Sequence, residues 1–408
     1  MLDDRLINPI TPAEKVKILR LFFVGLLLRL AVVLVLHFSA IERTLKLTQD
    51  ASLYDRMGKQ IANYFRNGGE TNWPFRVSNV LGHLYEYFVG ITYYLTDDSV
   101  LAVRVVNALC GSLVILVTWR MARYFTNADT AFRCGLGACF FPTMIYYSCL
   151  PVRDAQSTLG MALVFLGMTA ITSSGKQWHM MALPLGLLLT AGYRAYMAFA
   201  LVMLIPLAWL VTLLVTRSNE DVKLVRRNLI IALLAAAVIC PVAVAKLSST
   251  RKVEKTMSID SWNRIRKQLN TGSGALYEDG AVPGLGESAV ETVQSVAIGI
   301  YFFFVSVNPT EIRSVRQCLA LPEVLLVLYM MPSLWRGVRR VMRQHRFEFL
   351  SVLIVVAAIT LAYSSATTNA GPLLRWRLQV ANVYIVLAVI GFAASYSDGR
   401  GDETVPIQ

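Results

Sequence analysis

The sequence predicts an all-α fold: a polytopic transmembrane helical bundle of about ten spans, with amphipathic juxtamembrane helices in its first outer loop. Three observations support this class. Of the 408 residues, 55% are hydrophobic and only 16% are charged. The mean hydropathy is +0.52. The apolar residues form long continuous runs, unlike the short alternating segments of a transmembrane β-barrel. This composition excludes a soluble globular protein.

The charge distribution indicates membrane lipids as partners and argues against nucleic acid. The net charge is +13, but the basic residues form short bands between apolar runs. Such bands are typical of cytoplasmic loops that face anionic lipid. The chain contains no nucleic-acid-binding module and no glycine-rich phosphate loop. Its six cysteines form no CxxC pair, which favours buried thiols over a disulfide framework or a metal site.

The N-terminus is predicted to lie inside, because it contains the basic residues Arg5, Lys15, Lys17 and Arg20 before or at the start of the first apolar run. That run, from about residue 18 to residue 40, has no clear cleavage site and is expected to be a signal-anchor helix. Arg29 in its middle is costly in lipid, so its side chain should face the protein interior. We expect one membrane domain over residues 1–408, with residues 41–98 as the first outer loop.

The remaining topology follows from the charge rule. The segment 80–95 is short for a span, and we assign it to the outer surface or to a re-entrant element. The segment 297–307 is too short to assign. A long outer loop is expected over 246–291. Ten spans with both termini inside satisfy the basic loops; after the first, they cover 101–122, 134–148, 156–171, 178–192, 195–215, 228–245, 319–334, 349–363 and 380–394.

The first outer loop contains a predicted amphipathic helix that starts at Asp50. Leu53, Met57, Ile61 and Tyr64 recur at helical spacing behind it. An amphipathic helix with such an apolar face lies on a membrane surface. If the protein is an enzyme, we expect its chemistry at the start of this helix.

On this topology the outer face collects carboxylates, arginines and a tyrosine. A carboxylate can accept the proton of an attacking hydroxyl. Arginines can neutralise a phosphate leaving group through paired hydrogen bonds. The set therefore suits a reaction between a lipid-borne phosphate and a hydroxyl acceptor. Its members are Asp50, Tyr54, Asp55, His83, Glu86, Arg153, Asp154, Arg194, Arg375 and Arg377.

Several of these residues have a structural alternative. Asp50 is also a favourable helix N-cap, and capping does not exclude catalysis. Asp55 fits the solvated face of the same helix. Arg153 and Asp154 are adjacent at a junction of two spans and can form an interfacial salt bridge. Arg194 lies in a turn between two apolar runs and can extend to lipid headgroups.

The remaining candidates also have two interpretations. Arg375 and Arg377 can anchor a helix end together with Trp376, although two arginines on the outer side oppose the charge rule and favour function. His83 and Glu86 lie on one helical face; the structural interpretation, a mutual hydrogen-bonded pair, is favoured over contact with a sugar. Tyr54 suits stacking on a sugar as well as anchoring at the interface.

The order of motifs resembles the GT-C superfamily of integral-membrane glycosyltransferases, which includes protein mannosyltransferases, aminoarabinose transferases and oligosaccharyltransferases. The resemblance covers roughly residues 18–200 together with the last outer loop and span. It is carried by Asp50 and Tyr54, Asp97-Asp98, Arg104, Asn107, Trp119-Arg120, Arg123, Phe141-Pro142, Tyr146-Tyr147-Ser148 and Leu374-Arg375-Trp376-Arg377-Leu378-Gln379.

The resemblance implies roles for four residues. Asp50 corresponds to the aspartate that acts as catalytic base or orients the acceptor, and Asp154 to an acidic residue of the second outer loop. Arg375 and Arg377 correspond to an arginine pair near the lipid phosphate. The sequence departs from the family in two ways: Asp-Ala replaces the Asp-Glu pair of protein mannosyltransferases, and the WWD-type motif of oligosaccharyltransferases is absent. These departures argue against protein N-glycosylation and leave the need for a divalent metal open.

We therefore expect an inverting membrane glycosyltransferase at the outer face of a bacterial inner membrane. Its donor would be a polyprenyl-phosphate-linked sugar, its acceptor a lipid, glycan or protein, and no cofactor is assigned. A polysaccharide polymerase or ligase that uses a polyprenyl-diphosphate oligosaccharide is the enzyme alternative, favoured by the 246–291 loop. A lipid or solute transporter is the third; its usual inverted repeats are not evident in the sequence.

Overall fold

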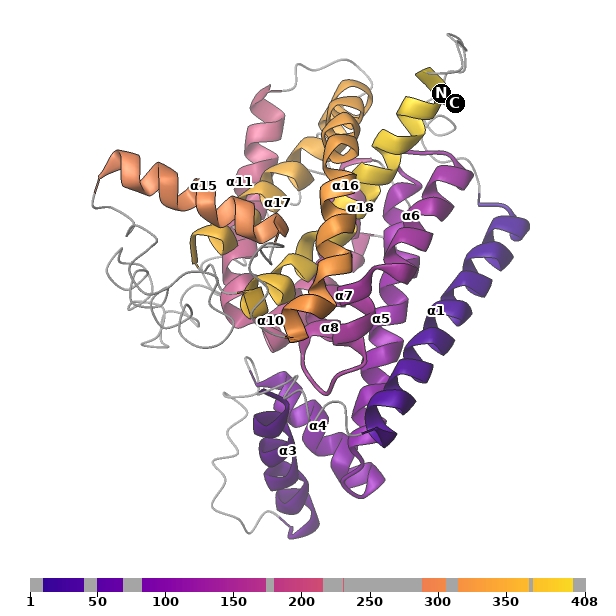
Figure 1. Cartoon of the computed structure of the whole chain (residues 1–408), viewed down its shortest axis with the longest axis vertical. Coiled ribbons are helices and arrows are strands. Elements are labelled where there is room, and N and C mark those ends of the chain that lie inside the picture. Colours follow the sequence, from indigo (N-terminus) through magenta and orange to yellow (C-terminus); the bar gives the residue numbers. More distant parts are fainter. Residues whose placement is uncertain are drawn as a thin grey trace.

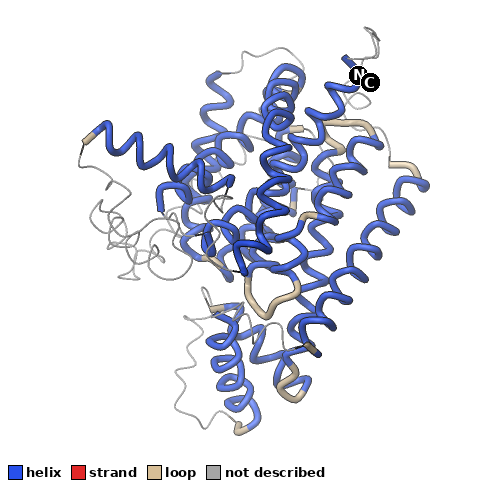
Figure 2. Tube along the Cα trace, in the orientation of Figure 1, coloured by secondary structure: helices blue, strands red, loops and turns tan. Residues whose placement is uncertain are grey.

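The computed structural model describes residues 10–39, 50–68, 83–173, 180–215, 230, 288–305, 315–366 and 370–398. Within these ranges all regular structure is helical, which confirms the predicted fold class (Figure 2). The predicted 246–291 loop and the 228–245 span lie almost entirely outside the described residues. The helices are α1 (Pro12–Phe38), α3 (Asp50–Arg66), α4 (Leu84–Thr96), α5 (Val100–Ala122), α6 (Ala128–Phe140), α7 (Pro142–Ser148), α8 (Asp154–Thr172), α10 (Ala182–Tyr193), α11 (Ala195–Val215), α15 (Ala289–Val305), α16 (Val315–Gln344), α17 (Arg346–Ala366) and α18 (Ala370–Asp398).

The long helices form a bundle, and α3 and α4 lie together beyond one end of it (Figure 1). We call this the α3–α4 end. The first residues of α1 lie toward the opposite end of the bundle. The last residues of α5, α16 and α18 lie toward that same end. The basic residues at the start of α1 and at the ends of α5 and α16 therefore gather away from α3 and α4, as the charge rule predicts for opposite membrane faces.

Six of the described helices are long and apolar enough to cross a membrane: α1, α5, α8, α11, α17 and the segment Gly371–Ser395 of α18. The segments Ala182–Tyr193 and Val290–Val305 are apolar but shorter. The number of ten spans stays a prediction. The expected span over 134–148 is instead two helices, α6 and α7, because the chain leaves the helical path at Phe141, directly before Pro142.

The outermost helix of the bundle is α1. A threonine–glutamate capping box at Thr11 and Glu14, with Pro12 between them, fixes its start. One side of the helix leaves large apolar side chains uncovered, among them Leu27 and Phe38, as expected for contact with lipid. Arg29 in the same helix is 0% exposed, so the prediction that it faces the interior is confirmed.

Glycines allow the closest helix pairs of the bundle. A Cβ on Gly337 of α16 would lie 1.8 Å from the Leu387 carbonyl oxygen of α18, and one on Gly391 equally close to the Ser333 carbonyl oxygen. Such backbone contact is possible only without a side chain, and small residues are the usual means by which membrane helices pack. Helix α16 is thereby fixed against α18, which contains the two arginines of interest.

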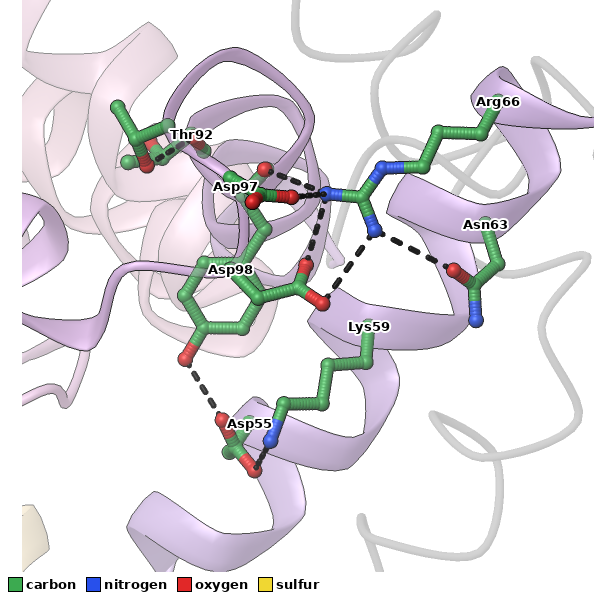
Figure 3. Close-up of polar contacts among 9 residues, drawn as sticks. Asp55, Lys59, Asn63, Arg66, Thr92, Asp97 and Asp98 are labelled. Carbon is green, nitrogen blue, oxygen red and sulfur yellow. Dashed lines mark hydrogen bonds and ion pairs between the residues drawn. The ribbon is translucent and has the colours of Figure 1, made fainter.

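Helices α3 and α4 pack against each other through a mixed polar and apolar contact (Figure 3). Arg66 at the end of α3 donates to both carboxylate oxygens of Asp98 at 3.1 and 3.3 Å and to the Tyr93 carbonyl oxygen at 3.0 Å. Asp55 accepts from Lys59 at 2.9 Å and from the Tyr93 hydroxyl at 2.7 Å. The predicted short element over 80–95 is thus a helix that covers α3.

The helix predicted to begin at Asp50 is confirmed, and the face that it buries within the protein shares only Ile61 with the predicted membrane-facing apolar side. The buried residues of α3 are Tyr54, Gly58, Ile61 and Ala62. Leu53, which was expected on the apolar face, is exposed. The difference arises because α4 packs against the neighbouring side of α3, where Gly58 permits close approach to α4.

Candidate functional site

Asp154 is the centre of a charged cluster at the α3–α4 end. It is the first residue of α8, and its side chain is only 1% exposed. Arg375 of α18 donates from Nε to Oδ2 at 2.9 Å, and Arg194 donates from Nη2 to Oδ1 at 2.5 Å. Each carboxylate oxygen therefore holds a different arginine, and this double pairing offsets the cost of burying the charge.

Arg375 also connects this buried carboxylate to the start of α3. Its Nη1 donates to Asp50 Oδ2 at 2.5 Å, so one guanidinium bridges α3 and α8. The Arg375 side chain is 22% exposed and that of Asp50 is 46% exposed. The bridge thus has a buried half at Asp154 and an accessible half at Asp50.

Asn107 of α5 fixes the turn that presents Arg153 and Asp154. The Asn107 amide is fully buried and donates to the carbonyl oxygens of Leu150 at 2.6 Å and Val152 at 3.0 Å. Its own oxygen accepts a hydrogen bond from Gln156 in the first turn of α8. One side chain therefore satisfies two backbone groups of the turn and the start of the next helix.

Arg194 lies at the junction of two helices, as the sequence predicts. Helix α10 ends at Tyr193, and α11 begins at Ala195. The Arg194 side chain is directed inward and 3% exposed, with Nη1 donating to the Tyr196 hydroxyl at 2.8 Å. This buried side chain therefore does not extend to lipid headgroups, which was the structural alternative for Arg194.

Tyr54 and Arg153 lie beside the cluster. Burial raises the pKa of Tyr54 to about 12, against the opposing effects of Arg153 and Arg375. Its ring contacts Tyr85 edge to face, with ring centroids 4.7 Å apart. The Nε of Arg153 is buried without a hydrogen-bond partner in the described structure.

The cluster has a formal excess of positive charge. Arg153, Arg194 and Arg375 act electrostatically on Asp154, and only Asp50 adds a second carboxylate to the ion pairs described here. With three guanidinium groups and two carboxylates, the cluster has a formal net charge of +1. An anion placed beside Arg153 and Arg375 would balance it.

Arg377 does not join this cluster. Successive residues of a helix are rotated by about 100°, so side chains two positions apart point to nearly opposite sides. Arg377 is 2% exposed and pairs with the fully buried Glu323 of α16. It also donates to the carbonyl oxygen of Phe304 at 2.6 Å, near the end of α15. Its predicted role at a lipid phosphate has no support from this geometry.

His83 and Glu86 pair with each other at the start of α4. His83 Nδ1 lies 3.4 Å from Glu86 Oε1, with the histidine side chain 55% and the glutamate 8% exposed. This contact matches the structural alternative for the two residues. Asp55, expected on a solvated face, is 34% exposed but engaged with Lys59.

Two buried polar groups had no role predicted from the sequence: Asn107, which holds the turn before Asp154, and Glu323, which pairs with Arg377 outside the cluster. Asn107 is a polar residue inside an apolar run, and a fully buried amide of this kind signals a structural hydrogen-bond network. Glu323 follows Pro322 within the apolar part of α16, and an acid at such a position calls for a buried partner. The partner, Arg377, is distant in sequence and was expected to bind the lipid phosphate.

A small cavity adjoins the buried side of Asp154. Its empty volume is about 240 Å³, and Tyr147, Ser148, Asp154 and Thr158 are among its lining residues. In the described ranges no three His, Cys, Asp or Glu side chains gather as a metal site would require.

The comparisons with known proteins agree with this architecture. Residues 82–244 match a family model described as dolichyl-phosphate-mannose-protein mannosyltransferase. The fold is similar to that of the archaeal oligosaccharyltransferase AglB from Archaeoglobus fulgidus, whose structure was solved with an inhibitory peptide and a dolichol-phosphate. The TM-score is 0.53 at 12% identity, over 97% of this chain and 53% of that one. No curated protein matches the sequence.

The resemblance to the GT-C superfamily of membrane glycosyltransferases is thereby confirmed. The segment that matches the family model includes Arg153, Asp154 and Arg194. The chain spans about half the length of AglB, so that likeness establishes the fold alone.

Proposed function

We propose that this protein transfers a sugar from a polyprenyl-phosphate-linked donor to a hydroxyl group of a lipid, glycan or protein acceptor. The observation that carries the proposal is the placement of Arg375 between Asp50 and Asp154, with an unbalanced positive charge beside it. The family description names a dolichyl-phosphate mannose donor, and AglB was solved with a dolichol-phosphate. Both support a lipid-borne phosphate as the anion that completes the cluster.

In this mechanism the donor phosphate binds Arg375 and Arg153. Phosphate oxygens compete with the accessible Asp50 for the Arg375 guanidinium, whereas the buried Asp154 keeps its bond to the same group. Arg375 is thereby held in place by Asp154 while Asp50 is released. The released carboxylate then becomes the acceptor for a proton.

The reaction that follows is a substitution at the anomeric carbon of the sugar. The acceptor oxygen attacks that carbon while its proton passes to Asp50. The bond between the anomeric carbon and the phosphate oxygen breaks, and its electron pair leaves with the polyprenyl phosphate. Arg375 and Arg153 stabilise the negative charge that develops there. Attack from the face opposite the phosphate inverts the anomeric configuration.

Tyr54 is a buried neighbour of the charged cluster. Because burial raises its pKa to about 12, its hydroxyl stays protonated at physiological pH and can donate a hydrogen bond. The phenol lies near both Asp50 and Arg375, on which its electrostatic surroundings depend. We assign it to binding of the sugar or of the phosphate.

We further propose that the α3–α4 end faces the periplasmic side of a bacterial inner membrane. The basic residues that end α5 and α16 lie toward the other end of the bundle. Positive residues are retained on the cytoplasmic side during insertion. The candidate site would then lie at the outer membrane face, where polyprenyl-linked sugars are presented to extracytoplasmic acceptors.

Phosphate recognition is tested by binding of the sugar-free product. Purified protein in detergent is unfolded thermally with undecaprenyl phosphate or with undecaprenol, which lacks the phosphate. We expect the phosphate to raise the midpoint and the alcohol to leave it nearly unchanged, since only an occupied native site stabilises. Arg375→Gln should abolish the rise, and Arg336→Gln at the opposite end should preserve it. An equal rise with undecaprenol, or in the Arg375 variant, would overturn the proposal.

A further inference from the structure

The interruption between α6 and α7 leaves backbone groups without their helical partners. Pro142 has no N–H, so the Ala138 carbonyl oxygen lacks the donor that would follow four residues later. The Thr143 N–H, which would serve Cys139 in a continuous helix, donates to Glu323 at 2.7 Å instead. Inside a membrane bundle the two freed carbonyl oxygens need other donors, because no lipid supplies them.

Arg29 of α1 supplies these donors. Its Nη2 lies 3.5 Å from the Ala138 carbonyl oxygen, and its Nη1 lies 3.4 Å from that of Cys139. Its Nε donates to the Ser148 hydroxyl at 3.1 Å, at the other end of α7. One guanidinium therefore contacts both the last turn of α6 and the last residue of α7.

The charge of Arg29 has no carboxylate counterpart among the ion pairs of the described residues. Its side chain is fully buried midway along a membrane-spanning helix, where an ionised group is expensive. A neutral donor would satisfy one or two oxygens at lower cost. Unlike such a donor, the planar guanidinium can donate hydrogen bonds to several oxygens in different directions at once.

The contacts of Arg29 continue to the candidate site. The Cys149 thiol donates to the Arg29 carbonyl oxygen at 3.3 Å, so the backbone after α7 is also tied to α1. The next residues form the 149–153 turn that Asn107 holds and that leads into Asp154. Ser148, the hydroxyl bound by Arg29, lines the same small cavity as Asp154.

We propose that Arg29 is a positioning residue for the transferase site: by occupying the oxygens freed at the α6–α7 interruption and the Ser148 hydroxyl, it fixes α7 and the 149–153 turn, and thereby the place of Asp154 against Arg375. This inference rests on the proposed function for its catalytic consequence. The structural part, that Arg29 holds α7 and the turn, can be measured without any substrate.

The first measurement is hydrogen–deuterium exchange of amides 143–153 in the full-length protein in lipid nanodiscs. Arg29→Met keeps an unbranched side chain, although a shorter one, and removes all of its donors. Exchange in this segment should rise roughly tenfold or more, as expected when bonds to a charged donor are lost. Arg29→Lys should restore part of the protection. The matched control is Arg123→Met, which removes a buried arginine paired with Glu14 at the opposite end and should leave exchange in 143–153 unchanged.

The second measurement is the kinetics of sugar transfer from polyprenyl-phosphate mannose. A displaced Asp154 should lower kcat by about 10²-fold, because misplacement by about 1 Å can have this effect, while KM for the donor changes much less. Arg29→Lys should recover part of kcat. Arg123→Met should keep kcat per folded molecule, so that a general loss of stability is distinguished from lost positioning.

Ser148→Ala covers the case in which the Arg29 variants fail to fold. It removes the hydroxyl that Arg29 binds, which also donates to the Ile145 carbonyl oxygen at 2.8 Å, and it should change exchange and kcat in the same directions by a smaller factor. Unchanged exchange over 143–153 in both Arg29→Met and Ser148→Ala, or a kcat effect no greater than that of Arg123→Met, would overturn the inference. If only the transfer proposal is wrong, the exchange result still distinguishes Arg29 from its control.

Discussion

Arg375 and Arg377 lie two residues apart on one helix, yet their surroundings differ in almost every respect. Arg375 bridges Asp154, which is 1% exposed, and Asp50, which is 46% exposed. Arg377 is 2% exposed, and its partner Glu323 is fully buried. The first ion pair has an accessible partner that an anion can replace, whereas both members of the second are buried. An arginine–carboxylate pair is therefore suited to chemistry only where one partner is free to leave.

The energetic consequences of the two arrangements differ accordingly. Removing one member of a fully buried pair leaves the other as an uncompensated charge, which strongly destabilises the fold. Removing Arg375 leaves the buried Asp154 still paired with Arg194 and leaves an Asp50 that is already 46% exposed, so the fold suffers less. Arg377 additionally borders an apolar cavity with about 390 Å³ of empty volume, lined by residues such as Met330 and Tyr384. We assign Arg377 to stability and Arg375 to ligand binding.

The largest loss of stability is expected at the buried pair of Arg377 and Glu323. Arg377→Met should lower the free energy of unfolding by about 3–5 kcal/mol, because Glu323 is left buried and unpaired. Adding Glu323→Gln should recover part of this loss, since the remaining charge is then removed. Thermal and denaturant unfolding in detergent measure both variants. Stability equal to that of the wild type in Arg377→Met would contradict the assignment.

Substitution of Arg375 is expected to change the free energy of unfolding less than substitution of Arg377, but to reduce the rate of transfer more. Arg375→Gln should lower kcat for transfer by roughly 10²–10³, or about 3–4 kcal/mol of activation free energy, because it removes a donor to the departing phosphate. Its unfolding free energy should fall less than that of Arg377→Met. The comparison breaks down if Arg377→Met reduces transfer per folded molecule as much as Arg375→Gln does.

The smallest effect concerns Tyr54 and alkaline pH. Burial raises its pKa to about 12, whereas an unfolded tyrosine has a pKa of about 10. Between these values the unfolded chain has released the proton that the folded protein retains, so stability falls as pH rises. Tyr54→Phe should lessen this fall by about 1–3 kcal/mol near pH 12. Unfolding midpoints of the wild type and of Tyr54→Phe, measured as a function of pH, test this prediction. Identical curves would show that the Tyr54 hydroxyl does not cause the loss of stability at alkaline pH.

Much of this molecule could be predicted from its sequence. Continuous hydropathy identified the all-α membrane fold, and the acid at Asp50 marked the start of α3. Charge alternation along the topology brought Asp50, Asp154, Arg194 and Arg375 to one face, and the structure joins these four in one network. Each of these predictions depends on local composition or on the alternation of helix directions, which a single sequence displays.

The remaining features depend on partners far apart in the chain. Arg377 was grouped with Arg375 because the family resemblance implies an arginine pair at the outer end of the last span, whereas α18 already begins at Ala370 and helical rotation separates the two side chains. The interruption before Pro142 was missed, since 134–148 was predicted as one span, and its stabilisation by Arg29 and Glu323 requires residues from α1 and α16. Sequence proximity misleads when the interaction is tertiary.

The central claim is that Asp50 accepts the proton of the acceptor, and Asp55 on the same helix provides a matched control. Both are acids of α3, but Asp50 binds Arg375, whereas Asp55 binds Lys59 and Tyr93. The decisive measurement compares transfer from polyprenyl-phosphate mannose by Asp50→Asn and Asp55→Asn, with undecaprenyl phosphate binding as a check of the folded site. We predict that Asp50→Asn loses about 10²–10⁴ in kcat and still binds the lipid phosphate, while Asp55→Asn transfers nearly normally. Normal transfer by Asp50→Asn would contradict the account.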